Sequence, residues 1–289
     1  MSRSLVAVFI LLGTVASEAS TILDAADAPG VSDADYQALG ALFPSVGRVD
    51  GNGFLDGSGV LIGDRWVLTA GHIGAFATSA IFTIGGANYS STNISIAPGY
   101  VFSFSAGAHD LALIELSNPV VGVMPVEMFG FGSPTDVLGR EATWVGFGIG
   151  GTGLSGQVPG LVAKRGFTNV IDSMGQFGLP GTAFVADFDR PGGTDNSDPG
   201  SDPNPTSLEG NVTPGDSGGG VFVKIGEVSY LVGINRFQGA LAPDVTRDGD
   251  YGDLSGATNL GLYAVWIESV SGIRAVPEPG VVVLLLLAG

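Results

Sequence analysis

The chain has no cysteine, few charged residues and very few basic ones. Without cysteine there is neither a disulfide framework nor a cysteine-based metal or redox site, so packing alone holds the 289 residues together. Only 11 Lys and Arg stand against 28 Asp and Glu, a formal net charge of −17. Because phosphate binding needs clustered basic side chains, this balance argues against a nucleic-acid partner. The chain has only two histidines, His72 and His109, so candidates for a general base are few.

Glycine is abundant, and its frequency favours an all-β fold. The 48 glycines and the 13% content of charged residues are typical of short strands joined by tight turns. Apolar runs between Gly, Asn and Asp predict a first series of strands at 59–62, 66–69, 80–84 and 111–114. A second series is predicted at 142–146, 182–185, 220–223 and 230–233. The length suffices for one large β domain or two small barrels.

Other segments predict helices and a loop around these strands. Helical spacing of apolar residues indicates a short amphipathic helix over 32–42 and a closing helix over 262–269. A linker or pro-like segment is the alternative for the first of these. Residues 187–205 are rich in Asp, Gly, Pro, Ser and Asn and are expected to form an exposed loop.

Both ends of the chain carry features of targeting. Residues 1–19 combine a basic start, an apolar run and small residues, which predicts a signal peptide and a secreted or cell-surface location. Near the other end, Pro277-Glu-Pro279 precedes an apolar run that is shorter than the ~20 residues of a membrane helix, so no stable transmembrane span is expected. This tail resembles a PEP-CTERM sorting signal, which implies an exosortase-type sorting enzyme as partner. The basic terminus of such signals is missing, which leaves a truncated signal, a variant signal or an ordinary apolar tail.

One glycine-rich motif is suited to nucleophilic catalysis. In Gly215-Asp-Ser-Gly-Gly-Gly220 the glycines allow a sharp turn that presents Ser217 and lets the backbone approach a substrate carbonyl. The backbone N–H groups of Gly215 and Ser217 can then stabilise an oxyanion, each worth roughly 3 kcal/mol. A plain β-turn is the alternative reading of this motif taken alone.

Two further motifs supply a base and an acid. Trp66-Val-Leu-Thr-Ala-Gly-His72 is an apolar strand that ends just before a histidine, and His109-Asp-Leu-Ala-Leu-Ile114 places Asp110 at the start of a buried strand. A buried carboxylate is costly without a partner, and a histidine N–H is one way to satisfy it, although a strand-capping role is the alternative. Adjacent strand residues point to opposite faces, so His109 is unsuited to pair with Asp110.

In this order the three motifs resemble the signature segments of trypsin-like serine proteases, and the looser match runs from about residue 45 to 270. The resemblance implies two six-stranded antiparallel barrels with the active site in the cleft between them and a short C-terminal helix. It implies Ser217 as nucleophile, His72 as base, Asp110 as its orienting acid, and a protein or peptide substrate. Gly71 stands where the family usually has alanine, and little loss is expected from this difference.

The resemblance also divides the chain into segments and suggests a specificity residue. After the signal peptide, the divisions are an N-terminal extension (20–44), a first barrel (45–130), a second barrel with the closing helix (131–270), and a linker with the sorting tail (271–289). Asn211, six residues before the serine, falls at the base of the primary pocket. Because it is uncharged, we expect neutral or apolar side chains to be selected.

Three points stay open at the level of sequence. No activation site of the family's kind precedes the first barrel, so Asp216 lacks an assigned partner; Lys164, Arg165, Arg236 and the amine left by signal cleavage are the candidates. The acidic segments 195–198 and 244–253 match no ordered calcium loop, so no metal or cofactor is expected. The alternative function is a catalytically silent trypsin-like module that binds at the cell surface.

Overall fold

The structure is a computed structural model that describes residues 20–52, 56–102, 108–175, 181–193, 195, 197–241 and 246–277. The predicted signal peptide and the apolar end of the predicted sorting tail lie outside these ranges.

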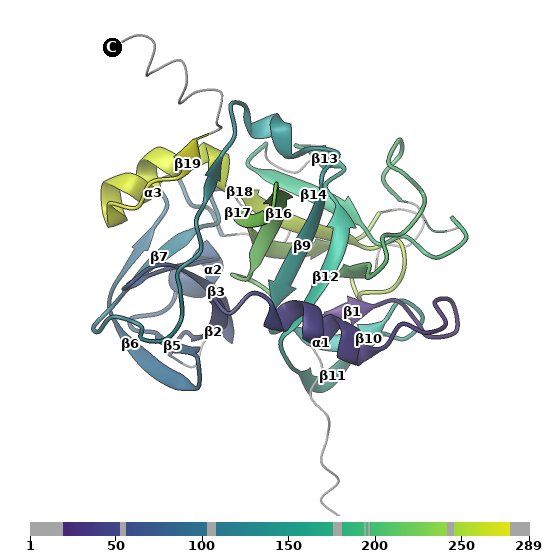
Figure 1. Cartoon of the computed structure of the whole chain (residues 1–289), viewed down its shortest axis with the longest axis horizontal. Helices are drawn as coiled ribbons and strands as arrows, with labels where there is room; N and C mark the ends of the chain where they lie inside the picture. The colour runs from purple at the N-terminus through teal and green to yellow at the C-terminus, as the bar shows by residue number, and fades with distance from the viewer. Residues whose placement is uncertain are drawn as a thin grey trace, which may run out of the picture.

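A closed antiparallel barrel forms the first half of the fold, at the left of Figure 1. Its strand order is β2-β3-β4-β7-β6-β5. The bounds are β2 (Val46–Asp50), β3 (Asp56–Gly63), β4 (Trp66–Thr69), β5 (Ile81–Ile84), β6 (Ala87–Ile96) and β7 (Ala112–Leu116). Apolar side chains fill its interior, because alternate residues of each strand point inward. They include Val49, Leu61, Val67, Phe82 and Ile114, each at most 1% exposed. Helix α2 (Gly71–Gly74) directly follows β4.

The second half is built on a seven-stranded antiparallel sheet of order β12-β9-β16-β17-β18-β14-β13. Its strands are β9 (Glu141–Gly146), β12 (Arg165–Val170), β13 (Ser173–Met174), β14 (Ala183–Asp187), β16 (Gly220–Ile225), β17 (Val228–Gly239) and β18 (Leu254–Asn259). Trp144 anchors its core, with its ring 5.9 Å from Phe167 and 5.8 Å from Phe184 between ring centroids. A separate four-stranded sheet has the order β11-β10-β1-β15, with β1 (Thr21–Ile22), β10 (Ile149–Thr152), β11 (Gly156–Val162) and β15 (Gly210–Asn211).

Two helices brace the sheets from outside. Helix α1 (Asp33–Ala41) lies along β12, and Gly40 permits this approach because a Cβ there would be 2.7 Å from the Arg165 carbonyl carbon. Near the C-terminus, the 3-10 helix η2 (Leu260–Leu262) leads into α3 (Ala264–Ser271), whose Ile267 is fully buried in the core shared by both halves. The 3-10 helix η1 (Pro134–Val137) precedes β9, and β19 (Val276–Pro277) pairs in parallel with β8 (Phe129–Gly130).

The predicted fold class is confirmed: the chain is mostly β, with a closed six-stranded barrel, a second sheet and a short C-terminal helix. The second half differs in detail, since its strands form an open seven-stranded sheet and a four-stranded sheet instead of one closed ladder. The expectation of an exposed loop over 187–205 is wrong in part, because Asp187, Asp189 and Asp198 are at most 4% exposed.

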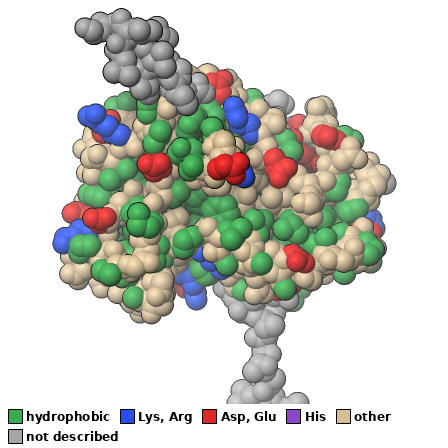
Figure 2. Space-filling view, viewed as in Figure 1, with side chains coloured by type: hydrophobic (Ala, Val, Ile, Leu, Met, Phe, Trp, Pro, Cys, Tyr) green, Lys and Arg blue, Asp and Glu red, His purple; other side chains and the backbone are tan. Residues whose placement is uncertain are grey.

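The distribution of basic side chains on the surface agrees with the low Lys and Arg content of the sequence. On the face seen in Figure 2, Lys and Arg side chains of the described residues are few and separated from one another. Within the described ranges, no helix has the length and apolar character that crossing a membrane requires.

Candidate active site

The three predicted motifs meet at one pocket between the barrel and the second sheet. The first half contributes Asp56, His72, Ile73, Phe102 and Asp110, and the second half contributes Ser217 together with residues 212–215 and 236–238. The site is therefore composite, because neither half alone contains all of the motif residues.

His72 and Asp110 are joined by two hydrogen bonds. His72 lies in the first turn of α2, just after β4 ends, so the rigid strand fixes its position. Its backbone N–H donates to Asp110 Oδ1 at 2.8 Å, and its ring Nδ1 lies 2.8 Å from Asp110 Oδ2. Burial by itself would raise the pKa of Asp110, but the hydrogen bond and charge of His72, with the charge of Arg236, outweigh it and hold that pKa below its ordinary value.

The loop that carries Ser217 is fixed by contacts across the two halves. Ser58 of β3 donates from its backbone N–H to Ser217 O at 2.7 Å, and Gly218 N–H donates to Asn235 O at 2.8 Å. Gly218 has a φ of +88°, and a Cβ there would lie 2.0 Å from Ser58 O, so only glycine fits. Among the described residues, the Ser217 hydroxyl makes no hydrogen bond to the His72 ring; the two side chains face the same pocket.

The backbone N–H groups proposed for the oxyanion lie in this same loop. Gly215 adopts a φ of +102°, which favours glycine, and its carbonyl accepts a hydrogen bond from Ser58 Oγ at 2.9 Å. Within the described part of the chain, neither the Gly215 nor the Ser217 N–H has a hydrogen-bond partner. Both donors are thus left unused by the residues that the structure describes.

Asp216 is fully buried, and hydrogen bonds surround it. Its carboxylate accepts from Ser20 Oγ (3.0 Å), Gly148 N–H (2.8 Å), Thr213 N–H (2.9 Å) and Thr213 Oγ1 (3.2 Å). Burial raises its pKa even though these donors oppose the change.

None of the three basic side chains suggested by the sequence pairs with Asp216. Lys164 Nζ donates to two backbone carbonyls, Arg165 pairs with Asp33, and Arg236 pairs with Asp110. The structure therefore does not support these three candidates. The side chain that contacts Asp216 belongs to Ser20, 196 residues away in sequence and the first residue after the predicted signal peptide.

Asn211 and His109 lie beside the site without facing into it. Asn211, in β15, is fully buried; its Oδ1 accepts from Ser255 Oγ, its Nδ2 has no partner among the described residues, and it is not among the residues that line the pocket. His109 Nδ1 lies 3.1 Å from the Tyr263 hydroxyl, away from the Asp110 carboxylate.

Arg236 is the pocket residue whose position the sequence did not reveal. Its Nε lies 3.4 Å from Asp110 Oδ2, and its side chain is 2% exposed. The sequence feature that could have pointed to it is a single arginine in an otherwise uncharged strand segment (229–239), because a charged side chain in a buried strand needs a partner.

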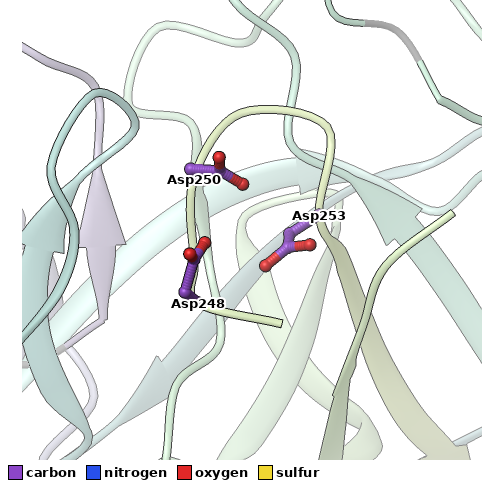
Figure 3. Close-up of side chains that lie close together, drawn as sticks. All are labelled: Asp248, Asp250 and Asp253. Carbon is purple, nitrogen blue, oxygen red and sulfur yellow. The ribbon is translucent and has the colours of Figure 1, made fainter. Parts of the chain in front are cut away.

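Acidic side chains gather at two places away from the pocket lining. Asp248, Asp250 and Asp253 point toward one another in a loop, with carboxylate oxygens within 4.8 Å (Figure 3), and Gly249 N–H donates to Asp253 at 2.7 Å. Just after β14, the backbone N–H of Asp189 donates a hydrogen bond to the buried Glu209 carboxylate at 2.7 Å, and the charge of Asp189 contributes to raising the pKa of Glu209.

Comparisons with known proteins agree with this fold. The family described as "Trypsin-like peptidase domain" matches residues 57–234, more than half of the chain. No curated protein sequence matches it. Among solved structures, HL collagenase is similar with a TM-score of 0.59 and 20% identity, over 83% of this chain and 98% of that one. Neuropsin, a serine protease expressed in the limbic system of mouse brain, is similar with a TM-score of 0.59 and 19% identity, over 81% of this chain and 97% of that one.

Proposed function

Because the chain belongs to the trypsin-like peptidase family, we propose that it is a serine endopeptidase that hydrolyses peptide bonds through an acyl-enzyme on Ser217. The observation that carries this proposal is the 2.8 Å contact between His72 Nδ1 and Asp110 Oδ2, in a pocket that Ser217 also lines. A hydroxyl is a weak nucleophile near neutral pH, and a base oriented by a carboxylate is the arrangement that activates it.

Each residue of the site has a separate role in the acylation and deacylation steps. Ser217 Oγ attacks the substrate carbonyl carbon while His72 Nε2 takes the hydroxyl proton, and the carbonyl electron pair moves onto oxygen. The negative oxygen accepts hydrogen bonds from the Gly215 and Ser217 N–H groups. When the C–N bond breaks, His72 returns its proton to the leaving amine. Water then attacks the ester by the same route, which releases the acid and restores Ser217.

We propose that the pocket prefers neutral or apolar substrate side chains. Asn211 does not line the pocket, so this preference rests on the pocket walls, which include the apolar side chains of Ile73, Phe102, Val212 and Phe237. Arg236 is a cation among the lining residues, but it is already paired with Asp110. Asp56 is exposed at the pocket rim, so a charged substrate side chain in the pocket interior would lose its hydration without gaining an unpaired partner there.

Casein hydrolysis tests the proposed activity. We expect cleavage by the wild-type protein, and its loss in Ser217→Ala and in His72→Ala, while Ser269→Ala, an exposed serine on α3, leaves it unchanged. Circular dichroism on each variant checks folding. Folded wild-type protein that cleaves neither casein nor an apolar peptide library would contradict the activity and favour a binding module instead.

We further propose that the protein is exported and that its maturation begins at Ser20. Removal of residues 1–19 would leave a free amine on Ser20, whose side chain is already 3.0 Å from the buried Asp216 carboxylate. A cation at this point would compensate a buried charge that has only neutral donors among the described residues. The PEP-CTERM-like tail suggests that an exosortase-type enzyme then sorts the protein to the surface.

The role of the Ser20 amine can be tested separately from the proposed sorting through the C-terminal tail. Protein that starts at Ser20 is expected to be more active than protein with one extra alanine before Ser20, because the extension moves the amine away from Asp216. Equal activity of the two forms would contradict a role for the amine. Mass spectrometry of exported protein reads the natural start directly.

A further inference from the structure

Arg236 is aimed at the candidate active site by an irregularity in its strand. The pairing of β17 with β18 runs from Asn235 opposite Ala257 to Phe237 opposite Gly256, so Arg236 is an extra residue in the ladder. Such a bulge re-aims a side chain, and bulges are common beside active sites. The guanidinium lies against the Phe237 ring, 5.4 Å from its centroid, and the residue is 4% exposed.

One carboxylate oxygen is shared between two donors. Asp110 Oδ2 lies 2.8 Å from His72 Nδ1 and 3.4 Å from Arg236 Nε, while Oδ1 is taken by the His72 backbone N–H. A carboxylate stabilises an imidazolium by its negative charge. An arginine on the same oxygen neutralises part of that charge and places a second positive charge near the ring, so both effects disfavour the protonated imidazole.

The other titratable groups around this pair leave Arg236 as the dominant charge. Tyr100, from the connection before β7, is half-buried, and Tyr263, just before α3, is buried; burial raises the pKa of both phenols, which keeps them neutral. His109 is turned toward Tyr263, and Asp56 lies exposed at the pocket rim on β3. Of the described residues, Arg236 is the one Lys or Arg that pairs with this carboxylate.

We propose that Arg236 is a positioning residue: it shares the Asp110 carboxylate oxygen with His72 and thereby weakens the electrostatic attraction between that carboxylate and a protonated His72 ring, which must be unprotonated to accept the Ser217 proton. The inference rests on the proposed function, since it assigns a role within that site.

The pH dependence of Ser217 labelling by a fluorophosphonate probe tests this role without a peptide substrate. In Arg236→Gln we expect the acidic limb of the rate profile to move upward by about one pH unit, which is a tenfold slower labelling at a fixed acidic pH. Arg236→Met is the second neutral variant. Because removal of one partner of a buried ion pair is destabilising, circular dichroism checks that both neutral variants are folded. Arg236→Lys restores the charge and is expected to return the limb toward the wild-type position.

A matched control separates charge from general destabilisation. Arg165 is an equally buried arginine, 1% exposed, that pairs with Asp33 and does not line the pocket. Arg165→Gln is therefore expected to leave the limb in place. If the acidic limb of the rate profile keeps its position or moves to lower pH in both neutral variants, the role of Arg236 is wrong. An equal shift in Arg165→Gln would also contradict it. Absence of labelling in the wild-type protein would instead contradict the proposed function itself.

Discussion

Ser58 connects the first barrel to the loop that carries Ser217, and its removal is a sharp test of how that loop is held. Its hydroxyl donates to Gly215 O at 2.9 Å and accepts from Phe147 N–H at 2.9 Å. Ser58 is fully buried. Ser58→Ala deletes both hydrogen bonds and leaves a carbonyl and an N–H without these partners, while the Ser58 N–H to Ser217 O contact is kept.

The expected cost follows from these two backbone groups. A buried polar group that loses its partner costs about 1–3 kcal/mol, so two such groups predict about 2–6 kcal/mol in the free energy of unfolding. At about 2 °C per kcal/mol for a chain of this size, that is a drop in Tm of roughly 4–12 °C. Because Gly215 also supplies a proposed oxyanion donor, a shift of its peptide is expected to slow Ser217 labelling roughly tenfold.

Thermal unfolding and the labelling rate of folded protein are the two readouts. Ser91→Ala serves as the control, since Ser91 Oγ accepts one hydrogen bond from Ala80 N–H at 2.8 Å in the same barrel and does not line the pocket. It should lower Tm slightly and leave labelling unchanged. A Ser58→Ala protein with wild-type Tm and wild-type labelling would refute the reasoning.

Two further predictions concern pH and close packing. Burial raises the pKa of Asp172 and Asp189 to about 8 and that of Glu209 to about 9. In the unfolded chain such groups lose their protons near pH ~4, so their stabilisation is present below that pH and is lost as pH rises through 8 to 9. Tm should therefore fall between about pH 5 and about pH 9; a Tm that rises over that range would contradict the burial of these groups. An alanine Cβ at position 71 would lie 2.8 Å from Leu111 N and 2.9 Å from Asp110 Oδ1. Gly71→Ala should therefore displace the Asp110 carboxylate and slow the labelling of Ser217 several-fold. In the control Gly181→Ala the new Cβ meets nothing within 4 Å, so labelling should be unchanged. Equal labelling of the two glycine variants would contradict this packing.

The sequence predicted best those elements that contain a short run of apolar, buried side chains. The strand expected at 66–69 coincides with β4 because an apolar run there is bounded by Arg65 and by small residues. Strand β6 (Ala87–Ile96) escaped prediction, since it is largely exposed and rich in Ser, Asn and Thr. Antiparallel pairing with β5 and β7 holds this segment in a strand, although its polar composition does not predict one.

Long-range polar contacts account for most of what the sequence could not predict at the site. His72, Asp110 and Ser217 were recognisable because each sits in a short motif with its own chemistry. Arg236 has no such motif, and its place beside Asp110 depends on a bulge that only the pairing with β18 reveals. The buried carboxyls of the segment 187–205 were expected in solvent, because composition alone does not show which acidic residues of a polar segment are buried.

The most direct measurement is a peptide map of protein treated with a fluorophosphonate. If a hydroxyl activated by His72 stands at the centre of the pocket, one adduct forms, on the peptide that contains Ser217, and it is absent from His72→Ala. An adduct on a different serine, or an unmodified Ser217 in folded wild-type protein at neutral and mildly alkaline pH, would contradict the assignment.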